Sequence, residues 1–232
     1  TPCQHQAMPR PARTPASPRT YRGTRLEERR AARRAQLIDA GLVCFGGIGY
    51  QGSSVRAICA EAGLTERYFY ESFPHSEALL CAVYDHLIEQ LLDRAVSAVE
   101  QARPDPLAMA RAALEVYLTF NADPRVARVT HFEILGVSET VDQRYRRAMD
   151  AFAALIEQTV QPLSPRPEEG VQTALVATGL VGAVVQIAMQ WFLSGYRLPQ
   201  STILRSALSL FEAVIQHTIK PVRPRKSNPR HS

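Results

Sequence analysis

Residues 171–196 contain no charged side chain, and this run constrains the fold more strongly than any other part of the chain. Only Thr178, Gln186 and Gln190 are clearly polar over residues 174–193, and about 20 consecutive apolar residues are enough to cross a bilayer. Two glutamines inside such a span would be costly in lipid. We therefore expect a central helix, apolar all round and buried in the protein. The alternative is a membrane-associated helical interaction protein that uses residues 171–196.

Apolar residues recur at helical spacing through most of residues 25–219, with glycine and proline at the breaks. The pattern predicts an all-α fold, with helices near residues 26–45, 55–62, 66–72, 76–102, 107–121, 124–135, 141–160, 168–194 and 201–219. Residues 1–24 and 220–232 are rich in proline and arginine and lack this periodicity. We expect them to form a disordered basic arm and a disordered basic tail.

Charge is distributed unevenly between the two ends of this helical region. Residues 1–75 hold 11 arginines and 6 acidic residues, whereas residues 76–219 hold 11 arginines and 16 acidic residues. A basic first part beside an acidic second part suggests that only the first part meets a polyanion such as nucleic acid. Charge and helix pattern together predict a three-helix domain over residues 25–75 and a larger helical domain over residues 76–219.

The first domain has the pattern of a helix-turn-helix, in which a turn containing Gly63 joins two short helices. Ser53 or Ser54 is placed to cap the first of them. The apolar residues expected to bury together are Leu42, Phe45, Val55, Ile58 and Leu64. This burial leaves four side chains able to face outward: Glu66, Arg67, Tyr68 and Tyr70. Arginine can read guanine in the major groove and tyrosine can reach phosphate, although a helical hairpin within an all-α protein would show the same pattern.

Residues 36–80 closely resemble the N-terminal domain of the tetracycline-repressor (TetR) family. The matching residues are Ala40, Phe45, Gly49, Tyr50, Ser53, Ser54, Val55, Arg56, Ile58, Ala62, Gly63, Leu64, Thr65, Tyr70, Phe73, Glu77, Ala78, Leu79 and Leu80. The resemblance implies a homodimeric transcriptional regulator that binds a palindromic double-stranded DNA operator. It also implies a repressor released by a small-molecule effector, which would bind in the larger helical domain that also dimerises.

The resemblance further implies roles for individual residues of the helix-turn-helix. Recognition-helix positions that meet DNA hold Glu66, Arg67 and Tyr70, and backbone-contact positions hold Ser53, Ser54 and Tyr68. The sequence departs from the family at Ser76, where a lysine often touches phosphate, and the adjacent His75 is a substitute for it. Because Glu66 and Glu71 leave the recognition helix without net positive charge, we expect phosphate contacts from the N-terminal arm and from the arginine-rich start of the first helix, including Arg25 and Arg29.

Polar and aromatic side chains of the larger domain are candidates for an effector cavity: Tyr117, Phe120, His131, Phe132, Glu133, Gln186, Gln190 and Trp191. Glu133 is the most suggestive, because a buried acid in an apolar stretch needs a partner, either Arg128 or an effector cation. In the resembled family the last two long helices form the dimer interface. The candidates for that interface are Val184, Ile203, Ala207, Leu210 and Val214.

Motifs of the common enzyme classes do not occur in the sequence, which has no H-E-x-x-H, no G-x-S-x-G and no close Ser/His/Asp spacing. We therefore expect no catalytic residues and no enzyme activity. The six histidines are scattered, so no metal site and no cofactor are expected. The four cysteines form no C-x-x-C pair, which is typical of free thiols in a reducing compartment, and we expect a cytoplasmic protein without a membrane partner.

Overall fold

The computed structural model describes residues 18–160 and 171–218; the side chains of residues 18–25, 160, 217 and 218 are not included in the description. The described residues form helices and no strand, so the predicted all-α fold is confirmed. The elements are α1 (Pro18–Ile48), α2 (Val55–Ala62), α3 (Glu66–Ser72), α4 (Ser76–Gln101), α5 (Pro106–Asn121), α6 (Pro124–Arg128), the π-helical turn η1 (Val129–Glu133), α7 (Glu139–Val160), α8 (Thr173–Leu193) and α9 (Gln200–Thr218).

Local sequence signals fix where several helices begin. The side chains of Ser54, Asp105 and Asp123 each accept a hydrogen bond from a backbone N–H in the first turn of the helix that follows. Pro106 and Pro124 occupy the first turn of α5 and α6, where a missing N–H costs nothing. These boundaries therefore follow from the chemistry of single residues.

The first three helices pack around one apolar core. Phe45 of α1, Ile58 of α2 and Phe69 of α3 are fully buried in it. Leu79 and Leu80 of α4 are buried in the same cluster, so α4 belongs to this domain as well as to the rest of the molecule. The predicted burial of Phe45 and Ile58 is confirmed, with Leu42, Val55 and Leu64 partly buried against them.

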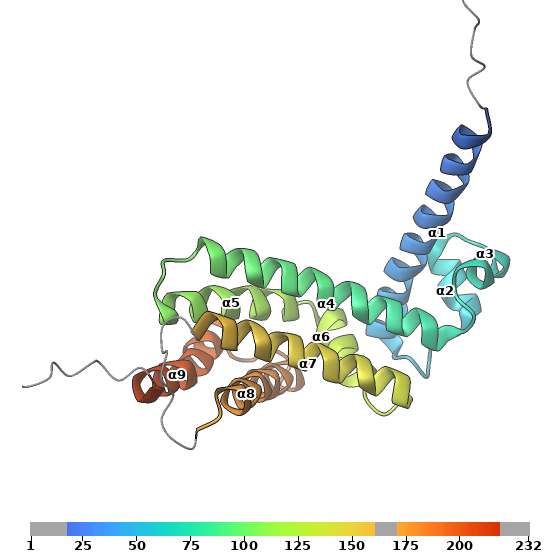
Figure 1. The fold of residues 1–232 in the computed structure, drawn as a ribbon. Helices are drawn as coiled ribbons and strands as arrows, with labels where there is room; N and C mark the ends of the chain where they lie inside the picture. The colour runs from blue at the N-terminus through green and yellow to red at the C-terminus, as the bar shows by residue number, and fades with distance from the viewer. Residues whose placement is uncertain (1–17, 161–170, 219–232) are drawn as a thin grey trace, which may run out of the picture.

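The second part of the molecule is a layered bundle built on α4 (Figure 1). Helix α4 lies along α5 and α7, α8 packs on α7, and α9 packs on α5 and α8. A second apolar core joins α5, α8 and α9, with Leu118 and Ala207 fully buried. The first half of α1 points away from this bundle (Figure 1), while its last turns contact α6.

The end of α1 differs from the sequence expectation, and glycine explains the difference. The helix continues through Gly46 and Gly47 to Ile48, and Gly49, with φ of 87°, ends it. A Cβ on Gly46 would lie 2.4 Å from Cβ of Arg125, so the absence of a side chain allows α6 to approach α1. This contact joins the helix-turn-helix domain to the bundle.

Other boundaries also differ from the predicted ones. Helix α1 begins at Pro18, so residues 18–24 are helical and the expectation that they are disordered is wrong; residues 1–17 and 219–232 lie outside the described residues. The helix predicted over residues 124–135 contains the π-helical turn from Val129 to Glu133, in which hydrogen bonds run to the fifth residue. Helix α8 begins at Thr173, later than predicted.

Helix α8 buries one side and exposes the other. It is the one helix in the described ranges that is long and apolar enough to cross a membrane. Ala188 and Trp191 are among its buried residues, whereas Leu175 is 67% exposed and Leu193 is 59% exposed. The expectation of a helix buried all round is therefore wrong for the single chain, because neighbouring helices of the chain cover one side only.

The predicted dimer-interface residues need the same correction. Val184, Ile203 and Ala207 are buried inside the protomer, and Val214 is partly buried against the same core. Of these five residues, only Leu210 is exposed to solvent, at 38%. The apolar stripe of α9 packs mainly on its own chain because α5 lies against it.

The two adjacent glycines of α1 give a matched test of the contact with α6. Gly46→Ala should lower the free energy of unfolding by about 1–3 kcal/mol, because the new methyl group overlaps the backbone of Arg125. Gly47→Ala meets no atom within 4 Å and should be neutral or stabilising by up to about 1 kcal/mol. Urea unfolding of the two variants measures both, and equal effects would show that α1 and α6 are not in close contact.

Candidate nucleic-acid interface and effector cavity

Helix α3 divides cleanly into a buried and an exposed face. Phe69 is fully buried and anchors the helix, whereas Glu66, Arg67 and Tyr70 are exposed, Tyr70 by 57%. Nε of Arg67 donates a hydrogen bond to Glu71 at 3.1 Å. This bond uses one edge of the guanidinium and does not require the terminal Nη atoms, which are the pair that reads guanine.

Three other candidate residues hold the backbone of the domain in place. Ser53 is buried, and its hydroxyl donates to the carbonyl of Gly49 at 2.7 Å. Ser54 is exposed and caps α2, and Nδ1 of His75 accepts from the backbone N–H of Ala78 and so caps α4. The side chains of Ser53 and His75 are thus already engaged within the domain.

The basic side chains of α1 lie close to α3. The Arg33 guanidinium carbon is 4.3 Å from the ring centre of Tyr68, which is half-buried, and Arg34 lies equally close to Phe73. One Nη atom of Arg33 is also 3.7 Å from the carboxylate of Glu71. These contacts fix positive charge beside the recognition helix. Arg29 is exposed on the same helix, and the side chain of Arg25 lies outside the described residues.

The larger domain encloses a long apolar cavity of about 270 Å³ between α4, α5, α7, α8 and α9. Tyr117 and His131, two of the sequence candidates, line it. On α4 the lining side chains are Tyr84, Ile88, Leu91, Ala95 and Val99, which step by three and four along one face. At about 1.5 Å per residue these five positions extend over about 22 Å, so the cavity is elongated along the bundle.

Polar side chains gather at the end of the cavity nearest the helix-turn-helix. Nε2 of His131 lies 2.9 Å from Oδ1 of Asn121 and 3.4 Å from the hydroxyl of Tyr117. Burial lowers the pKa of His131 to about 4, so the imidazole is neutral at physiological pH. The Thr130 hydroxyl donates to the carbonyl of Val126 at 2.9 Å. This end of the cavity is therefore polar and uncharged.

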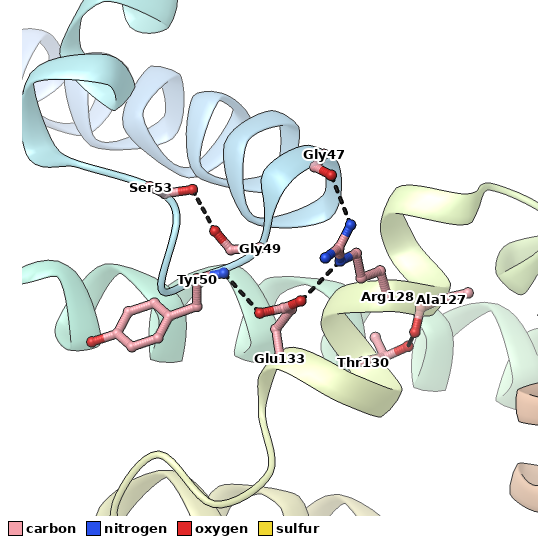
Figure 2. Close-up of polar contacts among 8 residues, drawn as sticks. All are labelled: Gly47, Gly49, Tyr50, Ser53, Ala127, Arg128, Thr130 and Glu133. Atoms are coloured by element: carbon pink, nitrogen blue, oxygen red, sulfur yellow. Dashed lines mark hydrogen bonds and ion pairs between the residues drawn. The ribbon is translucent and has the colours of Figure 1, made fainter. Parts of the chain in front are cut away.

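Glu133 points to the opposite side of the same turn from Thr130 (Figure 2), and it is not one of the residues that line the cavity. One of its carboxylate oxygens accepts from the backbone N–H of Tyr50 at 2.7 Å, and the other accepts from Nε of Arg128 at 2.8 Å. Nη1 of Arg128 donates to the carbonyl of Gly47 at 2.7 Å. Of the two partners expected for Glu133, the structure places Arg128 beside it. We call this set of contacts between η1 and the α1–α2 turn the Glu133 clamp.

The remaining sequence candidates do not line the cavity. Phe120 packs under the guanidinium of Arg94, Trp191 is buried and donates through Nε1 to the carbonyl of Leu198, and Phe132 stacks on the ring of Phe192. Gln186 and Gln190 are exposed on α8. The prediction that these five residues line the cavity was wrong. A residue type that suits ligand binding does not show which face of its helix points into the interior.

The sequence analysis missed six polar lining residues, namely Tyr84, Asn121, Thr130, Glu157, Thr159 and Thr173. Tyr84 is within one position of the apolar stripe of α4 and so looks like an ordinary core residue. Asn121 lies at the end of α5, at a position where asparagine commonly serves as a helix terminator. The burial of Asn121 is what marks it as a residue of the cavity, and this burial is visible only once α5 is packed against η1.

Comparisons with known proteins agree with this division into a DNA-binding domain and a helical body. The sequence model described as "Bacterial regulatory proteins, tetR family" matches residues 37–83. The fatty acid metabolism regulator protein of Bacillus subtilis is 19% identical over 186 residues, which cover 78% of this chain and 95% of that protein.

Solved structures repeat the fold over most of the chain. The fatty acid degradation regulator FadR from Bacillus halodurans superposes with a TM-score of 0.71 at 16% identity, covering 80% of this chain and 97% of that one. FadR from Bacillus subtilis in complex with stearoyl-CoA gives 0.67 at 18% identity, covering 76% and 96%. The matching sequence model, the exposed recognition helix and the all-α body of the same architecture together support residues 37–83 as the DNA-binding domain of a TetR-family transcriptional regulator.

Proposed function

We propose that the protein is a homodimeric repressor that binds a palindromic operator through α3 and leaves it when a long-chain acyl-CoA thioester fills the cavity of the body. The observation that carries the proposal is the shared position of η1. One side of this turn lines the apolar cavity through Thr130 and His131. The other side holds the backbone of Tyr50 through Glu133, and Arg128 at the adjoining end of α6 holds the carbonyl of Gly47.

The cavity suits a long apolar chain with a polar head outside. Its walls are mainly aliphatic and aromatic, and the one charged side chain among the described lining residues is Glu157. An anionic head group would find no cation there, and burying it unpaired would be costly. Glu157 and the exposed Val171 lie at the end far from the helix-turn-helix, so the thioester and nucleotide would remain at that end. The stearoyl-CoA complex of the Bacillus subtilis relative supports this ligand class.

The Glu133 clamp supplies a route from the cavity to the DNA. A chain that reaches Thr130 and His131 presses on a π-helical turn, and such turns lack the regular backbone register of an α-helix. Displacing the turn moves Arg128 and Glu133, and with them the backbone at Gly47 and Tyr50. Because two recognition helices must stand about 34–36 Å apart to enter successive major grooves, a small rotation of each DNA-binding domain weakens binding.

The exposed side of α8 is the best candidate for the dimer interface. It presents the apolar side chains of Leu175 and Leu193. A Cβ added at Gly179 or Gly182 would meet no atom within 4 Å, so a second helix could approach the backbone closely at these glycines. Leu210 of α9 adds a partly exposed apolar side chain. We infer that two copies pair through the exposed faces of α8 and α9.

Arg67→Ala tests the role of α3. We expect a loss of operator affinity of about 1–3 kcal/mol and a relaxed preference at one base position, because arginine pairs with guanine through two hydrogen bonds. Arg111→Ala, an exposed arginine on α5 that pairs with Glu115, is the control and should change neither. Selection from a random duplex pool followed by anisotropy titration measures both. A loss that is uniform over all sequences would assign Arg67 to phosphate.

Glu133→Gln tests the clamp. Losing the ion pair with Arg128 should leave stearoyl-CoA binding unchanged but reduce the factor by which this ligand weakens operator binding, from the 5- to 150-fold typical of allosteric proteins to about 3-fold or less. Glu139→Gln breaks an exposed ion pair with Arg146 on α7 and is the matched control. Operator titrations with and without stearoyl-CoA, with calorimetry of the ligand, separate the two effects. Undiminished coupling in Glu133→Gln would exclude the clamp.

A further inference from the structure

We propose that Glu157 sets the head-group specificity of the cavity: it admits a neutral acyl thioester and rejects the free fatty acid, whose carboxylate would lie beside the Glu157 carboxylate. The inference rests on the proposed function, because it concerns the head group of the ligand that fills the same cavity. It adds a specificity-determining residue to a cavity whose walls are otherwise mainly apolar.

The packing of α7 on α4 places Glu157 at the end of the cavity far from the helix-turn-helix. The two helices run in the same direction (Figure 1). The hydroxyl of Ser138, just before α7, donates to Glu77 in the first turn of α4 at 2.8 Å, and Arg144 pairs with Asp85 farther along. At about 1.5 Å per residue, Glu157 lies about 20 Å beyond Arg144 on α7, which brings it level with the last turn of α4.

This end of the cavity is the accessible one. Val171 is 41% exposed and is the one exposed residue among the described lining residues, and Glu157 is partly exposed. Asn121 and His131, at the opposite end, are buried. A ligand with a long apolar chain gains most when the chain fills the interior and the polar head stays near solvent. The head group therefore lies close to Glu157.

Glu157 gives this mouth its charge. One of its carboxylate oxygens accepts from the hydroxyl of Thr173 at 3.2 Å, and the hydroxyl of Thr159 donates to the carbonyl of Leu155 at 2.7 Å. No described lysine or arginine lines the cavity. Helices α5 and α8 begin at this end and α4 and α7 end there, so the opposite ends of their dipoles offset one another. The described lining residues thus present one negative charge to the head group.

A negative mouth separates head groups by charge. The carboxylate of a free fatty acid would lie beside Glu157 without an opposite charge, and like charges in contact near a protein surface repel strongly. A thioester carbonyl is neutral. The phosphates of CoA lie beyond the pantetheine arm, farther than the Debye length of about 8 Å at physiological ionic strength, so Glu157 acts on them weakly. Such a cavity responds to a fatty acid only after an acyl-activating reaction has joined its carboxyl group to a thiol.

Calorimetric titration of the full-length protein with stearate, S-stearoyl-N-acetylcysteamine and stearoyl-CoA tests the inference. The N-acetylcysteamine thioester is neutral and lacks the nucleotide, so its comparison with stearate isolates the charge of the head group. The wild-type protein should bind this thioester about 10-fold more tightly than stearate, a fraction of the repulsion between two unit charges in contact. Equal affinities for these two ligands would overturn the inference and leave the proposed function standing, whereas failure of stearoyl-CoA to bind would overturn both.

Glu157→Gln identifies the residue responsible. The amide keeps the size of the side chain and an oxygen that can accept from Thr173, so the variant should fold normally. It should bind stearate about 10-fold more tightly than the wild type does, so that the preference for the neutral thioester is lost. Glu157→Lys, which supplies a cation, should reverse the preference. A stearate affinity that stays at the wild-type value in Glu157→Gln would contradict the assignment.

Glu139→Gln is the matched control for the removal of one negative charge from α7. Glu139 is exposed at the start of the helix, pairs with Arg146 and does not line the cavity. The variant should keep the wild-type preference for the neutral thioester over stearate. An equal gain in stearate affinity in Glu139→Gln and Glu157→Gln would show that the net charge of the protein, and not the mouth of the cavity, sets the preference, and would overturn the inference.

Discussion

The contact between the end of α1 and the α6–η1 segment is the constraint on which the molecule depends. A side chain at Gly46 would overlap Arg125, so the two helices approach as closely as their backbones allow. Beside this contact, Glu133 receives hydrogen bonds from the backbone of Tyr50 and from Arg128, which itself reaches the carbonyl of Gly47. A charged pair that is also bonded to two backbone groups holds a defined geometry better than an exposed ion pair, which is worth little. The position of the DNA-binding domain therefore depends on this short turn as well as on α4, whose first residues are buried in the same core.

That turn also closes the ligand cavity, and this double role gives the proposed regulation its physical basis. Thr130 and His131 face the cavity, while Arg128 and Glu133 face the α1–α2 turn, although all four lie within six consecutive residues. A π-helical turn advances its side chains differently from an α-helix, so neighbouring residues can serve two sites on opposite sides. In the proposed regulation, ligand binding and DNA binding are linked through this element, and each would weaken the other by the same factor.

The two sides of helix α8 have different roles. Its buried side completes the cavity wall through Val181, Val184 and Val185, and its exposed side carries Leu175 and Leu193. A helix with no charged residue can serve both purposes because neither the cavity nor an apolar interface calls for charge. Since the same helix lines the cavity and offers the exposed apolar face, filling the cavity would bear on the pairing of two copies as well as on η1.

The sequence by itself determined the helices and the DNA-binding domain, because both depend on local signals. Single residues in the sequence predict the helix caps at Ser54 and Asp105 and the turn at Gly63. The spacing of apolar residues predicts helices α1 to α4 and the side chains that α3 exposes. The tertiary structure alone decided which polar residues meet the cavity. His131 and Glu133 are two residues apart in the sequence, yet one is buried beside Asn121 and the other binds Arg128 on the far side of the turn. Likewise Ile203 and Ala207 form an apolar stripe that fits a dimer face equally well, but α5 covers it within the same chain. Periodicity fixes which residues share a face, whereas the partner of that face depends on packing between helices that are distant in the sequence.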